Sequence, residues 1–477
     1  MIELKDKSVL VLGLGETGLS LVRWLGAQGA RLRVADSRSK PPGLEQVALH
    51  VPLSEVYCGL FHDALLQGVD LVAISPGVPL AEPLVQRAIA QNIPVAGDIE
   101  LFAQHINNSP LPLSREGRGS EREGRPLILA ITGANGKTTV TSMVGAMCRA
   151  AGLDTEVAGN ISPAVLDVLL QRQGKQPQVW VLELSSFQLE TTGSLHADAA
   201  AVLNISEDHL DRYADMEAYA AAKARIFIGS KVRVLNRDDA RSNAMVQAGS
   251  ACIKFGLDAP QGDSDWGIIR GGADNWLAQG QRRVMNAGEL QVAGMHNAAN
   301  ALAALALCRA IGLSQEPLCA ALRAFKGLPH RVEKVAEIKG VTYYDDSKGT
   351  NVGATEAALS GLGRQAVVIL GGDGKGQDFS PLRNAVAQHA RAAVLIGRDA
   401  GKIESALQGC GKPVARARDL NDAVRQSAAL AQAGDAVLLS PACASFDMFR
   451  NYEHRAEVFV AAVHDLQKEA TCCASQV

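Results

Sequence analysis

The segment Leu-Ile-Leu-Ala-Ile-Thr-Gly-Ala-Asn-Gly-Lys-Thr-Thr at residues 127–139 constrains the fold more than any other part of the chain. An apolar run stops at Thr132, and a glycine-containing turn then leads into Lys137 and a helical pattern. This order predicts a buried strand, a tight turn and a helix N-terminus, where free N–H groups and the helix dipole favour an anion. A strict phosphate loop has glycine where Ile131 stands, so we predict a shortened loop that binds ATP or GTP. The alternative is a glycine-rich turn with a chance lysine.

The side chains that follow the turn have the chemistry that a bound nucleotide needs. Lys137 adds a point charge for the terminal phosphates, and the Thr138 hydroxyl is placed to bind magnesium. The residues expected to contact ATP in this loop are Gly133, Asn135, Gly136, Lys137, Thr138 and Thr139.

The composition limits the class of protein. A chain of 477 residues suggests about three domains. The net charge of −3 and the aromatic content of 4% argue against nucleic-acid and membrane partners. Nine cysteines show no metal-ligand spacing, no signal peptide precedes Lys5 and no long apolar span occurs, so we expect reduced thiols in a cytoplasmic protein. We also expect a monomer.

Apolar runs alternate with helical patterns along three regions, which predicts an α/β fold with mostly parallel sheets. We predict a Rossmann-like domain at 1–98, a central phosphate-loop domain at 99–327 and a second Rossmann-like domain at 328–477. Residues 107–126 are rich in Pro, Gly, Ser and mixed charge, which predicts an exposed, mobile insertion. The other expected strands are 8–13, 31–35, 71–74, 93–95, 179–182, 200–203, 232–235, 367–370, 393–396 and 436–439.

The sequence Gly-Leu-Gly-Glu-Thr-Gly at 13–18 follows the first expected strand and matches the dinucleotide fingerprint. Asp36 ends the next strand, and Ser75 follows another strand at the same sheet edge. Taken alone, this pattern suggests an NAD-dependent dehydrogenase. The same glycine turn can hold any diphosphate, or can serve only to turn the chain.

Candidate metal ligands follow two strands of the central region. Glu183 ends a strand beside the phosphate loop and can hold magnesium together with Thr138, unless it is an exposed strand-end carboxylate. His209 lies in an acidic loop and is a candidate ligand for a second metal or a bridging group, although a lone histidine is often a satisfied structural residue. A helix is expected at 215–227 with Asp215 as its N-cap. On spacing alone, Lys223 in that helix reads as a solvated lysine.

Two amides, Asn297 and Asn300, share one face of a long Ala/Leu helix and can read an adenine edge. Further along, Arg331 supplies a cation at the next domain boundary, and residues 344–351 combine carboxylate, ammonium and hydroxyl groups.

Polar groups also follow the later strands of the third region. Lys375 follows a strand, and residues 440–447 are expected to open a helix whose N-terminus accepts a carboxylate. Cys443 in that segment reads as a buried thiol rather than a nucleophile, since no paired histidine is evident. These groups suit a substrate with two carboxylates, and their place opposite an ATP site suggests carboxylate activation followed by amine attack.

Together these motifs resemble the Mur ligase family. The resemblance covers almost the whole chain apart from the 107–126 insertion and the tail. The opening Gly-Leu-Gly-x-Thr-Gly is typical of the D-glutamate-adding branch, and the Asp-Asn-Pro-Arg of the diaminopimelate- or lysine-adding branch is absent. The most specific markers lie at 132–139, 183–190, 208–213, 296–300, 346–351 and 440–445.

The resemblance implies sets of residues for each substrate. The UDP-linked substrate is expected to contact Leu14, Glu16, Thr17, Asp36, Ser37, Arg38, Ser75, Asn160, Gln188 and His209. Further contacts to ATP are expected from Asn297, Asn300, Arg331, Asp346 and Lys348. D-glutamate is expected to contact Thr350, Lys375, Ser445, Phe446 and Tyr452. The implied ligands of two magnesium ions are Thr138 and Glu183 for the first, and His209 and a carbamylated Lys223 for the second. The implied catalytic residues are Lys137, His209 and Lys223.

The activity that the resemblance implies is an ATP-dependent amide ligase of peptidoglycan synthesis. It would activate the alanine carboxylate of UDP-N-acetylmuramoyl-L-alanine as an acyl phosphate and couple it to D-glutamate, releasing ADP and phosphate. We expect the third domain to close on ATP binding. The alternatives are another Mur-type ligase, a folylpolyglutamate-type ligase, an NAD-dependent dehydrogenase and a non-enzymatic nucleotide switch.

Overall fold

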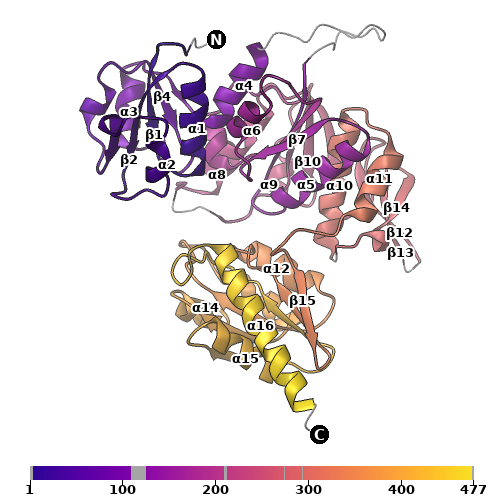
Figure 1. Cartoon of the computed structure of the whole chain (residues 1–477). Coiled ribbons are helices and arrows are strands. Elements are labelled where there is room, and N and C mark those ends of the chain that lie inside the picture. The colour runs from indigo at the N-terminus through magenta and orange to yellow at the C-terminus, as the bar shows by residue number, and fades with distance from the viewer. Residues whose placement is uncertain (1–3, 109–124, 209–211, 273, 293, 475–477) are drawn as a thin grey trace.

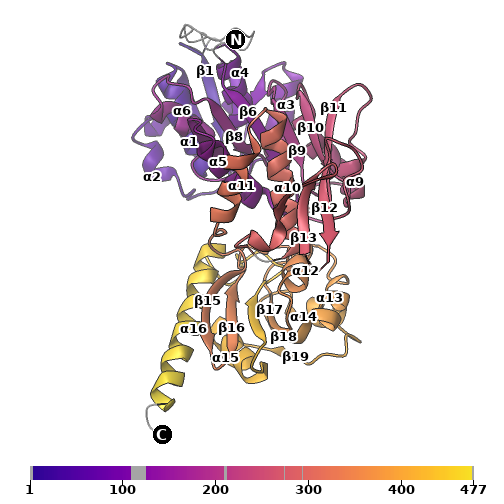
Figure 2. The same cartoon turned by 90° about the vertical axis from the view of Figure 1, so that its right-hand side faces the viewer.

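The computed structural model describes residues 4–108, 125–208, 212–272, 274–292 and 294–474. Its strands form sheets of five, nine and six strands, each covered by helices, so the α/β class predicted from the sequence is confirmed. We call each sheet with its helices the N-terminal, central and C-terminal unit. Figure 1 shows the N-terminal and central units side by side, and Figures 1 and 2 both show the C-terminal unit beneath them.

The N-terminal unit is built on an all-parallel sheet. Its elements are β1 (Ser8–Leu12), α1 (Glu16–Ala27), β2 (Arg31–Asp36), α2 (Leu44–Val47), β3 (Val56–Cys58), β4 (Leu71–Ile74), α3 (Pro83–Ala90) and β5 (Val95–Ala96), with 3₁₀ turns at Leu53–Glu55 and Asp63–Leu66. The strand order is β3-β2-β1-β4-β5. Along β1, Val9 and Val11 pack into one buried cluster while Leu10 and Leu12 pack into another. Successive side chains of a strand point to opposite faces, so this short apolar run serves both sides of the sheet.

The central unit carries the phosphate loop on a nine-stranded sheet. Its elements are α4 (Asp98–Asn108), β6 (Leu127–Thr132), α5 (Lys137–Ala150), β7 (Thr155–Gly159), α6 (Val165–Gln171), β8 (Val179–Glu183), α7 (Ser186–Glu190), β9 (Ala199–Val202), α8 (Met216–Ala224), β10 (Val232–Asn236), α9 (Ala240–Asn243), β11 (Ala251–Phe255), β12 (Trp266–Gly271), β13 (Asp274–Gln279), β14 (Arg282–Asn286), α10 (Met295–Ala310) and α11 (Gln315–Ala324), with 3₁₀ turns at Arg225–Phe227 and Ala287–Glu289. The strand order is β14-β13-β12-β11-β10-β9-β6-β8-β7. The strands β12, β13 and β14 pair antiparallel and extend the parallel part, which the sequence analysis did not foresee.

The C-terminal unit has a six-stranded sheet in the order β15-β16-β20-β17-β18-β19. Its elements are β15 (Glu333–Ile338), β16 (Val341–Asp345), α12 (Val352–Gly361), β17 (Ala366–Gly371), α13 (Leu382–His389), β18 (Ala390–Ile396), α14 (Ala400–Ala406), β19 (Val414–Arg416), α15 (Leu420–Leu430), β20 (Ala436–Leu439) and α16 (Tyr452–Ala474). All pairs are parallel except β15 with β16. The long helix α16 runs beside β15 along one side of this unit (Figure 2).

The prediction that a helix begins within residues 440–447 is wrong. The segment between β20 and α16 is an irregular loop, and the helix begins only at Tyr452. Ala442 has a left-handed φ of 57°, which a right-handed helix does not allow. The backbone of Ala444 instead pairs with Asp373 in an isolated antiparallel bridge.

The predicted insertion at 107–126 begins too early. Asn107 and Asn108 are the last residues of α4, and the Asn107 amide donates to the carbonyl of Ser194 at 2.9 Å. Residues 109–124 of the predicted insertion lie outside the described residues.

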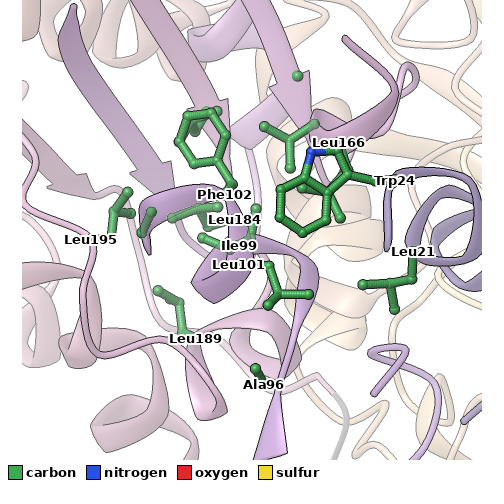
Figure 3. Close-up of a cluster of buried hydrophobic side chains, with 14 of the residues drawn as sticks. Leu21, Trp24, Ala96, Ile99, Leu101, Phe102, Leu166, Leu184, Leu189 and Leu195 are labelled. Carbon is green, nitrogen blue, oxygen red and sulfur yellow. The ribbon is translucent and has the colours of Figure 1, made fainter. Parts of the chain in front are cut away.

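The N-terminal and central units share one buried cluster. Trp24 of α1 is 4% exposed and lies near Leu166 of α6, while Phe102 of α4 stacks edge-on against Trp180 of β8 (Figure 3). Fully burying an apolar side chain of this size stabilises the fold by roughly 1.5–3 kcal/mol. Arg23 beside this cluster forms a bidentate ion pair with Asp167 across the same boundary. The contacts between α1 and α6, including this ion pair, hold the two units together.

Among the described helices, none is both long and apolar enough to cross a membrane.

Candidate active site

The predicted phosphate loop links β6 to α5 as the sequence analysis expected. Gly136 immediately precedes α5 with a left-handed φ of 82°. A Cβ atom at this position would lie 2.6 Å from the side-chain oxygen of Asn300 in α10. Glycine is therefore needed here both for the backbone conformation and for the close approach of α10.

Lys137 folds back over the loop. Its Nζ donates to the carbonyl oxygens of Gly133 and Ala134, each at 2.9 Å. Burial lowers the pKa of Lys137, and the negative charge of nearby Glu183 offsets this only in part. The ammonium therefore lies at the helix N-terminus, where an anionic ligand would meet it.

Lys223 is buried, so the solvated lysine expected from spacing alone is wrong. The side chain is 2% exposed, and its Nζ donates to the carbonyl oxygen of Gly133 at 3.0 Å. It also lies 4.6 Å from the ring centroid of Tyr219. Burial and the neighbouring charge of Lys137 lower the pKa of Lys223 well below its usual range. Asp215 caps the start of α8 as predicted and accepts from the N–H of Ala218.

Glu183 lies at the end of β8, next to β6 in the sheet, and is 2% exposed. Its Oε1 accepts from the side-chain amide of Asn160 at 2.8 Å. Its Oε2 is buried and has no hydrogen-bond partner among the described residues. A buried carboxylate oxygen without a partner is costly, and hard oxygen ligands of this kind suit magnesium. His209, the other proposed ligand beside Lys223, lies outside the described residues.

A cavity of about 370 Å³ separates the phosphate loop from the C-terminal unit. Residues predicted to bind ATP line both of its walls: Asn135, Gly136, Thr139, Asn297, Asn300, Arg331 and Asp346. Arg331 donates to the hydroxyl of Thr138 at 3.0 Å, and Asn351 donates to the side-chain oxygen of Asn135 at 3.0 Å. The structure thus brings residues far apart in the chain together around one space.

Asp346 and Lys348 lie in the loop after β16. Burial raises the pKa of Asp346 to about 7, although a hydrogen bond from the Ser440 hydroxyl at 2.6 Å works in the opposite direction. The Nζ of Lys348 lies 5.0 Å from the ring centroid of Tyr452, and burial lowers its pKa. Lys348 and Tyr452 were assigned to different substrates, so their contact places these two predicted subsites next to each other.

The residues predicted to bind D-glutamate lie beyond the carboxyl ends of three neighbouring strands and at the start of α16. Thr350 follows β16, Lys375 follows β17, and Ser445 and Phe446 follow β20. Ser445 is 3% exposed, whereas Phe446 is 73% exposed. Tyr452 begins α16, and its hydroxyl donates to Glu453 at 3.1 Å.

Cys443 in the same region is fully buried, and burial raises the pKa of its thiol to about 12. This agrees with the prediction of a buried thiol rather than a nucleophile.

The glycine turn at 13–18 joins β1 to α1 tightly. A Cβ at Gly18 would lie 1.8 Å from the carbonyl oxygen of Gly13, and one at Gly13 would lie 3.0 Å from the Cβ of Ser75. Ser75 is itself buried at the end of β4. Leu14 is also buried, while Glu16, Thr17, Ser37 and Arg38 are exposed or half-buried.

Asp36 is fully engaged within the protein. Its Oδ2 accepts from the N–H of Leu14 at 2.7 Å, and the Arg38 guanidinium binds both of its carboxylate oxygens. Burial alone would raise the pKa of Asp36, but the hydrogen bonds from Arg38 and Leu14 outweigh it and lower the pKa. The carboxylate therefore orients Arg38 and the turn after β1.

Gln188 is buried inside the central unit, between α7 and α4. Its side-chain oxygen accepts from the N–H of Ser185, and its amide donates to Asp98 at 2.9 Å. Gln188 and Ser185 form a reciprocal capping box at the start of α7.

Asp98 is a buried acidic residue that was not predicted from the sequence. It is 1% exposed, its Oδ1 has no partner among the described residues, and burial raises its pKa to about 6. No local motif marks it, because its burial arises from the packing of α4 against other elements of the central unit, such as α7.

Arg212 was also missed as a contact between the first two units. It donates to the carbonyl oxygen of Pro76 at 2.8 Å and to Glu190 at 2.9 Å, and it lies 4.1 Å from the ring centroid of Phe187. It therefore joins the loop after β4 to α7. The available signal in the sequence was that Arg212 lies three residues after the candidate metal ligand His209.

Comparison with known proteins gives matches along the three units. The MurD-like N-terminal domain of Mur ligases matches residues 7–97, the Mur ligase middle domain matches 131–308, and the Mur ligase glutamate ligase domain matches 330–443. The chain is 58% identical to the UDP-N-acetylmuramoylalanine–D-glutamate ligase of Nitrosospira multiformis, over 97% of this chain and 96% of the relative. It is also 58% identical to the enzyme of the same name from Methylobacillus flagellatus, over 98% and 99% of the two chains.

A solved structure has the same fold at low identity. The UDP-N-acetylmuramate–alanine ligase of Thermotoga maritima superposes with a TM-score of 0.59 at 17% identity, covering 96% of this chain and 99% of the other. Enzymes of this family depend on ATP and typically on magnesium. The chain belongs to the Mur ligase family, in its UDP-N-acetylmuramoylalanine–D-glutamate ligase branch.

Proposed function

We propose that the chain is an ATP-dependent ligase that joins D-glutamate to UDP-N-acetylmuramoyl-L-alanine in the synthesis of peptidoglycan precursors. The observation that carries this proposal is the cavity between the phosphate loop and the C-terminal unit. One wall carries Gly136 at the helix N-terminus, and the other carries Arg331 and Asp346. A nucleotide bound in this cavity would lie between the acid substrate, bound by the N-terminal unit, and the amine substrate, bound by the C-terminal unit.

The chemistry proceeds in two steps. A carboxylate oxygen of the substrate alanine attacks the γ-phosphorus of ATP, the bond to ADP breaks, and an acyl phosphate forms. The amine of D-glutamate then attacks the acyl carbon, phosphate leaves, and a proton is released as the amide forms. The N–H groups at the start of α5 and the ammonium of Lys137 stabilise the negative charge on the transferred phosphoryl group. Holding both reactants between two units replaces a slow encounter by a near-unimolecular step.

The proposed first magnesium site consists of Thr138 and Glu183. The buried Oε2 of Glu183, which has no partner among the described residues, supports this assignment. The amide of Asn160 holds the other carboxylate oxygen and so fixes the direction of the free one. When bound, magnesium supplies positive charge to the triphosphate. A second ion with His209 and a modified Lys223 completes the proposal.

Carbamylation of Lys223 explains why a lysine is buried beside the phosphate loop. Its Nζ shares the carbonyl oxygen of Gly133 with Lys137, so two ammonium groups in this place repel each other. The uncharged amine can attack carbon dioxide, forming an N–C bond and releasing a proton. The resulting carboxylate is an oxygen ligand for a hard cation.

The three units divide the substrates between them in this proposal. Domains at 1–98, 99–327 and 328–477 bind the UDP group, ATP and D-glutamate, respectively. Arg38, oriented by Asp36, supplies a cation for the diphosphate. Asn160 and Gln188 are proposed to face the muramoyl-alanine group. The hydrogen bond from Gln188 to Asp98 fixes the position of the Gln188 side chain. We also infer a monomer that works in the cytoplasm, where ATP is available.

The competing interpretations explain less of the chain. A dehydrogenase accounts only for the glycine turn at 13–18, and Asp36 is already bound by Leu14 and Arg38. A folylpolyglutamate-type ligase does not need the N-terminal unit, whose residues 7–97 match the MurD-like domain. A non-enzymatic nucleotide switch does not need a C-terminal unit that carries predicted binding residues for an amino-acid substrate, such as Lys375.

The decisive experiment measures phosphate release by the purified protein with ATP and magnesium. We expect release only when UDP-N-acetylmuramoyl-L-alanine and D-glutamate are both present, with the amide product identified by mass. L-glutamate and a folate acceptor are the comparison arms. Phosphate release that depends on folate, or that ignores the amino acid, would overturn the proposed activity.

A further inference from the structure

The turn at residues 397–399, directly after β18, contacts two of the loops that carry predicted D-glutamate residues, those after β17 and β20. The N–H of Arg398 donates to the Asp447 carboxylate at 2.9 Å, and the Arg398 guanidinium donates to Asp373 at 2.9 Å. The carboxylate of Asp399 accepts from the N–H of Gly374 at 2.8 Å. Asp373 and Gly374 directly precede Lys375, whereas Asp447 follows Phe446. One short turn therefore holds two loops that come from different strands.

The backbone of Lys375 needs such support. Its φ of 49° is left-handed, a conformation that residues other than glycine adopt only when their surroundings hold it. The carboxylate of Asp373 accepts from the N–H of Lys375 at 3.1 Å. The backbone of Asp373 also exchanges two hydrogen bonds with Ala444, at 3.0 and 2.9 Å. Asp373 therefore links Lys375 to the loop of Ser445.

The two acidic residues that hold this loop are themselves fixed. Asp399 is 5% exposed and pairs with Lys402 at 2.8 Å. Burial would raise the pKa of Asp399, but the hydrogen bonds from Lys402 and Gly374 outweigh it and lower the pKa. The second oxygen of Asp373 accepts from Arg398, whose side chain is 62% exposed. Arg398 is the exposed end of a chain of contacts that leads through Asp373 to Lys375.

We propose that Arg398 is a positioning residue for the amino-acid substrate, acting through Asp373 to fix the backbone of Lys375. The inference rests on the proposed function, which assigns Lys375 to D-glutamate. Arg398 does not touch the substrate. Its removal leaves one oxygen of Asp373 without its cation, so the loop of Lys375 is held by fewer contacts.

The first test compares Arg398→Ala with Arg416→Ala. Arg416 lines a surface cavity together with Arg398 and is 57% exposed, but it pairs with Glu404 rather than with either loop. We expect the KM for D-glutamate to rise about 5-fold in Arg398→Ala, as for loss of one partly exposed ion pair. The KM values for ATP and the UDP-linked substrate and the melting temperature stay unchanged, and Arg398→Lys recovers part of the loss. Arg416→Ala changes none of these values.

A double-mutant cycle tests the route through Lys375. If Arg398 acts through Lys375, adding Arg398→Ala to Lys375→Ala causes no further rise in the KM for D-glutamate. Independent, multiplying effects would overturn the inference, as would an equal rise in all three KM values or no rise in any. Where Lys375→Ala turns over too slowly, the KM pattern of the single variant decides. A wild-type protein that does not use D-glutamate would instead contradict the proposed function.

Discussion

Arg331 of the C-terminal unit donates a hydrogen bond to the hydroxyl of Thr138 in the first turn of α5, at 3.0 Å. The Thr138 oxygen is also the proposed ligand of magnesium. A guanidinium and a metal ion cannot both approach one hydroxyl oxygen closely, because their charges repel. Binding of magnesium–ATP is therefore expected to move Arg331 from Thr138 onto a phosphate oxygen, which suits its forked donors.

The first prediction concerns Arg331→Met. We expect the KM for ATP to rise about 10- to 100-fold, because a charge-assisted hydrogen bond contributes about 1.5–3 kcal/mol. Steady-state kinetics at varied ATP measure the change. Arg364→Met is the matched control, since Arg364 is exposed and contacts Thr342 within the C-terminal unit. An unchanged KM for ATP would show that Arg331 does not bind the nucleotide.

The second prediction is that the C-terminal unit closes on nucleotide binding. The described contacts between it and the central unit include polar ones, such as Asn351 with Asn135 at 3.0 Å and the N–H of Asp378 with Glu207 at 3.4 Å. Such contacts can exchange during a rigid-body movement at little cost in buried apolar surface. Small-angle scattering with and without ATP analogue and UDP-linked substrate is expected to show a smaller radius of gyration in the complex. The same radius in both states would rule out closure.

The third prediction tests carbamylation of Lys223. We expect Lys223→Ala to lose most activity, and short carboxylic acids such as formate or acetate to restore part of it, because they supply the missing oxygen ligand. Lys231→Ala is the control, since Lys231 is an exposed lysine paired with Asp198. Turnover is measured across acid concentrations in both variants. A Lys223→Ala protein that is fully active without added acid would end the carbamate hypothesis.

The fourth prediction concerns Glu183→Gln. Removing the charge of the buried carboxylate is expected to raise the magnesium concentration needed for half-maximal activity about 10-fold or more. Glu156→Gln, in which the half-buried Glu156 loses its pair with Arg172, serves as control. A normal magnesium requirement in Glu183→Gln would exclude it as a ligand.

The fifth prediction is a pH dependence of stability that comes from Asp98. Burial raises its pKa from 3.8 to about 6, so the folded state favours the protonated carboxyl. The contribution of Asp98 to the free energy of unfolding is fully present below pH 3.8 and is lost as the pH rises through 6. The full difference is about 3 kcal/mol.

Asp98→Asn mimics the neutral acid at every pH. We expect the fall in melting temperature between pH 5 and pH 8 to be smaller in this variant than in the wild type. Asp263→Asn, at an exposed position, is expected to follow the wild type. Parallel pH profiles for Asp98→Asn and the wild type would show that Asp98 does not titrate in this range.

Much of the fold followed from local patterns in the sequence. Short apolar runs such as β1 and β6 are buried on both faces. Gly13 and Gly136 lie in the predicted turns and have positive φ. The antiparallel extension at β12–β14 was missed because polar and apolar residues mix along it. The helix expected at 440–447 failed because Ala442 adopts a left-handed backbone that its side chain does not signal.

The site was only partly predictable. The phosphate loop could be recognised because its glycines stand between an apolar strand and the start of a helix. Asn297 and Asn300 could be recognised because helix geometry puts residues three apart on one face. The burial of Lys223 could not, because it depends on the distance between α8 and the carbonyl of Gly133, which are far apart in the chain. The same holds for Asp98, whose pKa shift arises from burial beside Gln188, which is far away in the chain. The ligand roles assigned to the individual residues stay predictions.

The shared cluster of Trp24, Phe102 and Leu166 also bears on how the protein could be divided in the laboratory. A fragment that starts after β5 would turn the apolar side of α6 towards water, and such newly bared surface promotes aggregation. A shortened protein without residues 7–97 is therefore expected to aggregate. The segment beginning at β15 encloses hydrophobic clusters of its own, and it is the better candidate for separate expression.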